Sequence, residues 1–544
     1  MKNRLIYAFA FAALAFTSCN QATETEVETK KNTSTEQNFD EILSKYKTEV
    51  PTKILTPDHV DSRLGGLEFY DGIPTQSTID KVYDNIDFAR GVDVFLNFIP
   101  ATSIEGLRLG MIELGVDDYN KVMVLDKLLD AKGLFLTGNA STVYASTFFD
   151  LEKNGPTVVE IPAGAGPGTV NDAFFRFVVD MGAPGPDRKK GGMYIILPPD
   201  YEGDLQITPN SFNDNSSVKA EVGGEMRDVW IAQSKSYNNW IILRGFLEDG
   251  KPDAAAKMWK EGLKIYPLKD ANNPKKMEFI SGSGKVFNTI HANNYDFYAE
   301  LNDVIQKEPI SFIDPELRGQ AASIGIIKGE KFAPDTRMQK ILKDAIKVGN
   351  ATARAISFSP RDKKAYIYEG KQWITGFIGK DYQWLDLDGH RGRNMDARTM
   401  FFYLATVNTP AMALEVPGVG SNYGFSSKDK NGELLYGEKN YKLHIDANVP
   451  AKDFWSIVVY DPQTRSMLQT NQDFPNKNSQ KDPLVYNEDG SCDLYFGPTA
   501  PKRNKENWIQ TVPGKAWFVL FRTYGPLETW FDKTWQLNDF ELVE

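Results

Sequence analysis

Apolar residues recur at helical spacing near the start of the folded part of the chain. Between residues 78 and 92 they form a stripe, and three aspartates lie outside it. The stripe consists of Ile79, Val82, Tyr83, Ile86, Ala89 and Val92, and the aspartates are Asp80, Asp84 and Asp87. The spacing predicts a helix over Thr78–Gly91 and a second helix over Thr102–Leu114.

Between about residues 134 and 247 the pattern changes to short apolar runs bounded by glycine and proline. Such runs are typical of strands in an antiparallel sheet or sandwich. The predicted strands are Val158–Ile161, Phe174–Val179, Met193–Leu197, Val229–Ala232 and Trp240–Leu243.

Helical spacing returns between residues 252 and 358, and strand-like runs return after residue 441. The predicted helices are Ala254–Ile265, Asn294–Ile305 and a long helix that Pro334 and Asp335 begin. The predicted C-terminal strands are Tyr441–Ile445, Phe454–Tyr460, Leu494–Phe496 and Trp517–Arg522. The whole pattern predicts an α+β fold, with two antiparallel β-sandwich-like regions joined by a mainly helical middle region.

Residues 1–19 have the pattern of a targeting segment. Lys2 and Arg4 precede an uncharged apolar run, Leu5–Phe16, which is too short to span a bilayer. The run ends in small residues before Cys19, which resembles a bacterial lipoprotein signal whose cysteine is acylated; a plain secretory signal is the alternative. We expect a signal peptide over 1–18 and a flexible tether over 19–50, because residues 20–40 almost lack large apolar side chains. The body would then be secreted across the inner membrane and lipid-anchored, in the periplasm or on the outer-membrane surface.

Composition excludes several classes of protein. The chain has 544 residues, a net charge of −11, two cysteines and four histidines. An acidic body argues against a nucleic-acid partner, which needs a clustered basic face. The histidines (His59, His291, His390 and His444) share no metal-ligand spacing, so a zinc site is disfavoured, while a calcium site from carboxylates stays open.

Arginines within or at the end of apolar runs are the more informative polar feature. Arg176, Arg244 and Arg522 each lie in or end a predicted strand. A guanidinium stays charged and is costly to bury unpaired, so each needs an anionic partner, from the protein or from a ligand. Arg354 and Asn350 form a further polar face, four residues apart on the predicted long helix.

Two other features can each be interpreted either as functional or as structural. Near the C-terminus an aromatic cluster that includes Trp530 suits either sugar stacking or core packing. His291 lies in a polar turn before a predicted helix, where it is either a general base or a hydrogen-bonded structural residue.

Several longer motifs resemble the DUF1254 and DUF1214 domains, and the resemblance covers roughly residues 60–544. The DUF1254-like motif includes Gly185-Pro186-Asp187 and Lys190-Gly191-Gly192-Met193-Tyr194-Ile195-Ile196-Leu197-Pro198-Pro199-Asp200-Tyr201. The DUF1214-like motif includes Asp493-Leu494-Tyr495-Phe496-Gly497-Pro498, Tyr524-Gly525-Pro526-Leu527 and Trp530-Phe531-Asp532-Lys533-Thr534-Trp535. We therefore expect a DUF1254-like helix plus β region over 51–250, a mainly helical region over 251–420 and a DUF1214-like β-sandwich over 421–544.

The resemblance implies secreted or envelope proteins, some of them encoded in polysaccharide-degradation loci of marine bacteria. One branch is associated with water elimination from uronic-acid-terminated ulvan oligosaccharides. Many members carry Asn-x-Asp-Thr-hydrophobic-Tyr. Here the stretch is Asn139-Ala140-Ser141-Thr142-Val143-Tyr144, so the Asp is missing while Asn139 and Tyr144 persist.

From this resemblance we expect a carbohydrate-active lyase, a dehydratase acting on acidic, ulvan-type oligosaccharides, with no cofactor. Tyr144 and His291 are the candidate acid and base. The candidate substrate-binding residues are Asn139, Arg176, Arg244, Arg354, Arg522 and Trp530. The expected partners are the oligosaccharide and, through Cys19, a membrane. The alternative is a non-catalytic glycan-binding or envelope-assembly lipoprotein.

Overall fold

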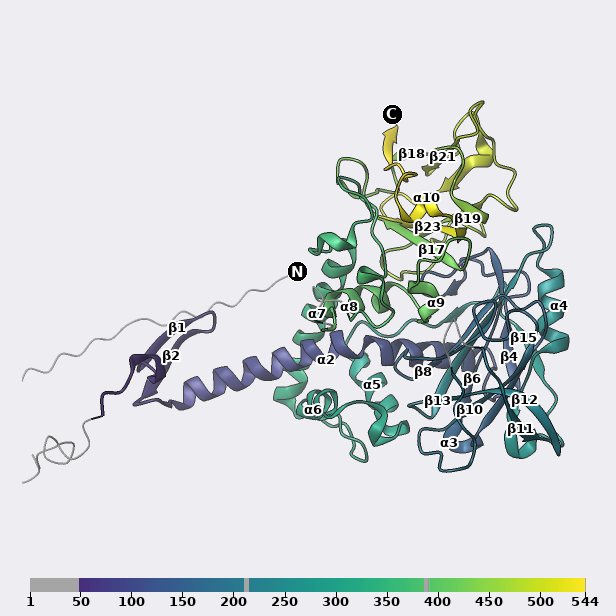
Figure 1. Ribbon diagram of the computed structural model, residues 1–544. Coiled ribbons are helices and arrows are strands. Elements are labelled where there is room, and N and C mark those ends of the chain that lie inside the picture. Colours follow the sequence, from purple (N-terminus) through teal and green to yellow (C-terminus); the bar gives the residue numbers. More distant parts are fainter. Residues whose placement is uncertain (1–47, 210–214, 386–389, 391, 544) are drawn as a thin grey trace, which may run out of the picture. The chain divides into compact units, whose positions relative to one another are not determined.

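The computed structural model describes residues 48–209, 215–385, 390 and 392–543, and over these the chain has a mixed α+β fold, as predicted (Figure 1). The signal peptide, Cys19 and nearly all of the expected tether lie outside the described residues. The chain divides into two compact units between Ile79 and Asp80. None of the described helices is long and apolar enough to cross a membrane.

The first unit contains the short helix η1 (Thr52–Ile54) and a three-stranded antiparallel sheet. Its strands are β1 (His59–Ser62), β2 (Gly65–Tyr70) and β3 (Ile73–Pro74). Thr78, in the first turn of the following helix, is hydrogen-bonded to strand β2. Its hydroxyl accepts from the Glu68 amide and donates to the Glu68 carbonyl.

Helix α2 (Gln76–Glu113) is one continuous element of 38 residues, where the sequence predicted two helices (Figure 1). Residues 97–107 are buried on every side, the polar Asn97, Ser103 and Glu105 included, so this stretch has no exposed face. Without an exposed face the apolar and polar positions follow no amphipathic period, which is why the pattern did not predict a continuous helix there. Pro100 lies inside the helix and removes one backbone donor, which the surrounding core tolerates.

Two sheets form the N-terminal sandwich and enclose a shared apolar core. The six-stranded sheet has the order β15-β4-β6-β13-β8-β9 and the five-stranded sheet has the order β11-β12-β10-β7-β14. The first sheet contains β4 (Lys121–Val124), β6 (Thr142–Asp150), β8 (Pro167–Asp172), β9 (Phe177–Gly182), β13 (Asn238–Phe246) and β15 (Glu278–Ser281). The second contains β7 (Thr157–Ile161), β10 (Gly192–Leu197), β11 (Val218–Val222), β12 (Glu225–Gln233) and β14 (Lys264–Pro267).

Most of these strands pair antiparallel, but β10 with β12 and β4 with β15 are parallel pairs. Short elements complete the region: α3 (Leu151–Asn154), α4 (Asp253–Gly262), η2 (Leu268–Asp270) and the small parallel pair β5 (Gly133–Leu134) with β16 (Phe287–Asn288). The helix predicted over Ala254–Ile265 thus ends at Gly262, and its last residues belong to β14.

The middle region is mainly helical, as predicted. It contains α5 (Asp296–Lys307), η3 (Ile310–Phe312), α6 (Pro315–Ser323), α7 (Thr336–Phe358), η4 (Lys363–Ala365), η5 (Ile378–Lys380), α8 (Met395–Leu404) and α9 (Pro410–Ala413). Asp335 begins α7 as the sequence predicted, since its carboxylate accepts from the Met338 amide at 2.7 Å. Apolar residues of α2, α5, α7 and α8 share one core with residues of both sandwiches.

The C-terminal sandwich consists of two four-stranded sheets, β17-β23-β19-β20 and β22-β21-β18-β24, around a core of their own. Its elements are β17 (Ser421–Ser426), β18 (Asn440–Ile445), β19 (Ala451–Tyr460), β20 (Asn476–Asn478), β21 (Cys492–Gly497), η6 (Lys505–Asn507), β22 (Trp508–Gln510), β23 (Phe518–Pro526), α10 (Glu528–Phe531) and β24 (Glu541–Val543). β21 and β22 pair in parallel.

Candidate functional site

Strand alternation turns one arginine of each sandwich toward the helical region. In β13, Ile241 and Leu243 pack in the N-terminal sandwich core, so Ile242 and Arg244 point to the opposite face. In β23, Phe521 packs in the C-terminal sandwich core, and its neighbour Arg522 points the other way by the same rule.

These two faces line a common cavity. Its wall includes Tyr144 and Arg244 from the N-terminal sandwich and Tyr423 and Arg522 from the C-terminal sandwich. Apolar residues of α8 and of the segments 374–377 and 404–407 complete the lining. The cavity measures about 120 Å³, and a smaller space of about 70 Å³ adjoins it at Ile242, Arg244 and Tyr423.

Tyr144 and Arg244 face each other across the β6–β13 pair. They are register partners, and the Arg244 guanidinium carbon lies 5.6 Å from the centre of the Tyr144 ring. The Asn139 Nδ2 donates to the Tyr144 hydroxyl, and the side-chain Oδ1 of Asn139 accepts from the Ser141 backbone amide at 2.8 Å. The second bond fixes the orientation of the Asn139 amide group, so that its NH2 faces the Tyr144 oxygen. The hydroxyl hydrogen of Tyr144 is then free to be donated to another group.

Arg522 also lies opposite a tyrosine, in the C-terminal sandwich. Its register partner on β17 is Tyr423, and the centre of the Tyr423 ring lies 6.0 Å from the Arg522 guanidinium carbon. One Arg522 nitrogen donates to the Thr137 carbonyl at 2.6 Å. The side chain is 3% exposed, and its Nη1 has no hydrogen-bond partner among the described residues. A buried guanidinium nitrogen without a partner is a donor available to a ligand.

The charge of the cavity is positive. Among the described residues neither Arg244 nor Arg522 forms an ion pair, and the lining carboxylate Glu415 is paired with Lys380 at 2.5 Å. Burial acts to lower the pKa of Arg244, yet that pKa is raised overall, because the hydroxyls of Tyr144, Tyr423 and Tyr524 face the group. Two uncompensated guanidinium groups therefore face a small enclosed space, an arrangement that suits an anion.

Asn139, Tyr144, Arg244 and Arg522, four of the residues proposed from sequence, thus meet at one cavity. Tyr423, Lys380 and Glu415 were missed. Tyr423 reaches the site only because β17 pairs with β23, a strand about a hundred residues further along the chain, and its local sequence carries no sign of this pairing.

His291 does not line the cavity. Its ring lies against Phe297 and Tyr403, its Nδ1 is 2.9 Å from the Ala292 carbonyl, and it is 2% exposed. Burial and, to a smaller extent, the nearby Arg465 together lower the pKa of His291 to about 3. The imidazole is therefore neutral at physiological pH and enclosed by aromatic rings.

Arg176 and Arg354 also lie away from this cavity. Arg176 was expected inside a strand, but it lies in the turn between β8 and β9 and pairs with Asp172. The Asp172 carboxylate accepts from the amides of Phe174 and Arg176, which stabilises a turn where the apolar pattern favoured a strand. Arg354, on α7, donates to the carbonyls of Pro462 and Gln463 and so joins the helical region to the C-terminal sandwich.

Trp530 belongs to the core of the C-terminal sandwich. It is 4% exposed and packs against Phe521 and Trp535. Trp517, from the same predicted aromatic cluster, is 1% exposed and stacks on Phe496. These rings pack in the core and offer no open face to a sugar.

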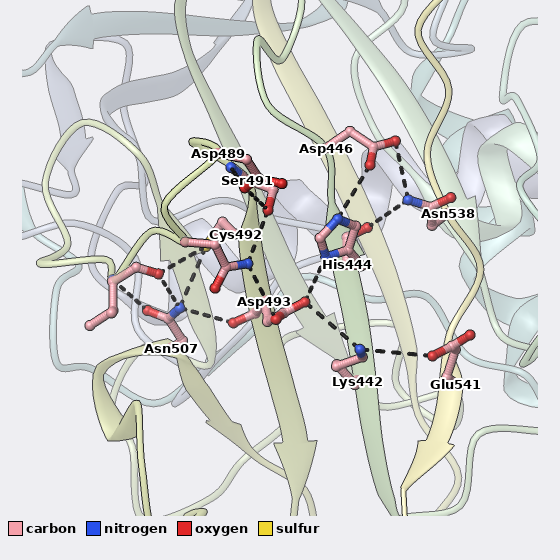
Figure 2. A network of polar contacts seen from close by, with 12 residues as sticks. Lys442, His444, Asp446, Asp489, Ser491, Cys492, Asp493, Asn507, Asn538 and Glu541 are labelled. Carbon is pink, nitrogen blue, oxygen red and sulfur yellow. Dashed lines mark hydrogen bonds and ion pairs between the residues drawn. The ribbon is translucent and has the colours of Figure 1, made fainter.

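A second polar cluster lies on the outer sheet of the C-terminal sandwich (Figure 2). His444 on β18 is held between Asp493 at 2.7 Å and Asp446 at 3.3 Å, and Lys442 approaches Asp493 at 4.0 Å. These contacts link β18 to β21, and Asn538, in the segment before β24, donates to the His444 carbonyl and to the Asp446 carboxylate. No group of three or more histidine, cysteine or acidic side chains in the described ranges is placed to hold a metal ion.

Comparison with known proteins places both sandwiches in families without an assigned activity. Residues 119–267 match the family described as "Protein of unknown function (DUF1254)", and residues 420–528 match "Protein of unknown function (DUF1214)". No curated protein matches the chain.

Two solved structures are similar over most of their length. The VPA0106 protein from Vibrio parahaemolyticus shares 15% identity, with 85% of this chain and 100% of that chain covered and a TM-score of 0.49. An uncharacterized protein from Burkholderia cenocepacia shares 11% identity, with 85% and 96% covered and a TM-score of 0.36.

Proposed function

Because the chain is a DUF1254/DUF1214 domain-containing protein, and because both domains contribute an arginine to one cavity, we propose that it is a carbohydrate-active lyase. The proposed reaction is the elimination of water from the uronic acid end of an acidic, ulvan-type oligosaccharide. The observation that carries the proposal is the pair Arg244 and Arg522, two guanidinium groups that face an enclosed space without a carboxylate partner among the described residues.

The reaction makes specific demands on the site. The C5–H bond and the C4–oxygen bond break, a C4–C5 double bond forms, and the proton leaves with the hydroxyl as water. The negative charge that develops next to the carboxylate must be stabilised, which Arg244 and Arg522 can do from two sides. A bidentate guanidinium–carboxylate pair would also fix the orientation of the sugar ring.

Tyr144 is the proposed acid–base group. Of the two candidates, it lines the cavity while His291 does not. The phenol oxygen accepts from Asn139, so its own hydrogen can point toward a leaving hydroxyl. The phenol gives this hydrogen to the C4 hydroxyl, which leaves as water, and takes the C5 proton in its place, so that the phenol is regenerated and no proton is gained or lost overall. This chemistry requires no organic cofactor.

The small volume of the cavity supports action at a chain end. About 120 Å³ admits part of one terminal sugar. The positive lining reconciles an acidic chain of net charge −11 with an anionic substrate, because only the pocket must be positive. Secretion and lipid attachment at Cys19, which would bring the site to extracellular or periplasmic oligosaccharides, belong to the same proposal.

The test is to incubate the purified protein with oligosaccharides that end in a uronic acid, in sulfated and unsulfated forms. Elimination predicts a product lighter by one molecule of water and a new near-ultraviolet absorbance from the conjugated double bond. Binding without any change in mass would refute the lyase and leave the glycan-binding lipoprotein. The heat-denatured protein serves as the control for spontaneous elimination.

A further inference from the structure

A second cavity, of about 900 Å³, lies in the helical region and shares no lining residue with the first. Its walls come from the β8–β9 turn, the segment from η3 to α6, the residues 382–384 and the start of α8. The cationic side chains that line it are Arg176, Lys235, Arg318, Arg393 and Arg398. The described carboxylates in its lining are Asp172 and Asp314, so the cavity is positive in a chain whose net charge is −11.

Both of these carboxylates have other partners. Asp172 pairs with Arg176 at 2.5 Å, and Asp314 caps α6 by accepting from the Leu317 amide at 2.9 Å. Among the described residues, the other three arginines use uncharged acceptors. Arg318 donates to the carbonyls of Ile310 and Ile313, Arg393 to the carbonyl of Gln383, and Arg398 to the side chain of Asn97. No carboxylate within the described ranges forms a direct ion pair with these three side chains.

Two guanidinium nitrogens at this cavity are buried without a partner among the described residues, Nη2 of Arg176 and Nε of Arg398. Arg398 is 6% exposed. Burial and, to a smaller extent, the neighbouring Arg393 together lower the pKa of Arg398 to about 10. Like charges held together in a partly buried wall are costly, and a bound anion would remove that cost.

The aromatic wall orients one of these groups. The guanidinium carbon of Arg176 lies 5.8 Å from the ring centre of Phe174 and 5.2 Å from that of Phe312. These contacts and the ion pair with Asp172 hold the guanidinium against the wall, and its planar fork of donors suits an oxyanion.

We propose that this second cavity is a binding site for a tetrahedral oxyanion, a sulfate or phosphate group, held by the guanidinium groups of Arg176, Arg318, Arg393 and Arg398. The site does not rest on the lyase proposal, because Arg244 and Arg522 do not line it. The group can arrive as a free inorganic ion or as a sulfate ester on a saccharide, and both sources present the same oxygen atoms to the arginines.

The test measures binding to the full chain by isothermal titration calorimetry. Sodium sulfate, sodium phosphate and a monosulfated disaccharide are titrated separately, and sodium chloride keeps the ionic strength constant. The unsulfated disaccharide is the matched ligand control. We expect saturable binding of an oxyanion to the wild-type chain. We expect at least roughly tenfold weaker binding in Arg393→Ala and in Arg318→Ala, two residues that are not fully buried.

One variant serves as the matched control. Arg227→Ala removes an exposed arginine of β12 that pairs with Glu225 and lines neither cavity, so it should bind the anions as the wild type does. Tighter binding of the sulfated disaccharide than of inorganic sulfate identifies the ester as the source, and equal binding identifies the free ion. Absence of saturable binding by all three anions, or equal affinity in Arg393→Ala, Arg318→Ala and the wild type, would overturn the proposal.

Discussion

Tyr144 and Arg244 are register partners on the antiparallel strands β6 and β13, and the guanidinium carbon lies 5.6 Å from the centre of the phenol ring. Directly opposed residues on one face of a sheet are the closest cross-strand neighbours. Their mutual position is therefore set by backbone pairing and does not depend on a mobile loop. The phenol and the guanidinium are therefore preorganised at the wall of the cavity, and ligand binding does not have to bring them together.

The first prediction concerns the phenol oxygen of Tyr144. Tyr144→Phe removes the hydroxyl and keeps the ring against Arg244. If Tyr144 carries the proton, the rate of elimination should fall by roughly 100-fold or more, the usual contribution of a positioned acid–base group. The assay is the loss of water by mass spectrometry. Tyr237→Phe, which removes a hydroxyl bonded to Asp200 outside the cavity, should leave the rate unchanged. Full activity in Tyr144→Phe would exclude the phenol from the chemistry.

The second prediction concerns the shape of the cation at position 244. Arg244→Lys keeps the charge but replaces the planar fork with a single ammonium. Affinity for a uronate-terminated oligosaccharide should fall by about tenfold or more, because a bidentate contact is lost. Calorimetric titration of the variant and of Arg227→Lys, an exposed matched substitution, provides the measurement. An unchanged affinity in Arg244→Lys would show that the carboxylate does not bind at this guanidinium.

Local pattern was sufficient for strands such as β10, β13 and β19 and for the start of α7, because alternation and capping act between residues close in sequence. It did not predict β4, β6, β8 or β17. It failed for α2, where residues 97–107 are buried all round, and for Arg176, where the Asp172 carboxylate stabilises a turn. The sequence named four residues of the cavity, yet it gave no reason to place Arg244 near Arg522. That proximity arises from two sheets that pack on a common helical core, which no local pattern encodes.

The third prediction concerns the close approach of α2 to the segment before α5. A Cβ at Gly110 would lie 2.2 Å from the Asn288 carbonyl oxygen, and one at Gly106 would lie 3.0 Å from the Thr289 carbonyl oxygen. Gly110→Ala should therefore lower the free energy of unfolding by about 2 kcal/mol or more, although alanine is the better helix former. Urea unfolding followed by circular dichroism measures this change.

The matched control for this substitution is Gly319→Ala on α6. No atom lies within 4 Å of a Cβ built at Gly319, so helix propensity should dominate there. This variant should be as stable as the wild type or more stable by up to about 1 kcal/mol. Equal effects of the two substitutions would mean that α2 does not pack against residues 288–289 as closely as described.

The last prediction concerns Asp180 on β9, beside the smaller of the two adjoining spaces. Its Oδ2 accepts from the Thr409 hydroxyl at 2.7 Å, and its Oδ1 has no partner among the described residues. Burial raises the pKa of this carboxyl from 3.8 to about 7. The folded chain therefore holds a proton at Asp180 over a pH range in which the unfolded chain has released it.

This difference fixes the sign of the pH dependence. The stabilisation from the protonated Asp180 is fully present below about pH 3.8 and is lost as the pH rises through about 7. Asp180→Asn cannot ionise, so its free energy of unfolding relative to the wild type should rise by about 2–3 kcal/mol between pH 5 and pH 8.5. Urea unfolding of both proteins at the two pH values measures this change. Asp344→Asn, at an exposed carboxylate, should show a constant difference from the wild type. If the difference in unfolding free energy between Asp180→Asn and the wild type is also constant, Asp180 is already ionised at pH 5. The space beside Arg244 would then carry a full negative charge at neutral pH, which would oppose the binding of an anionic ligand.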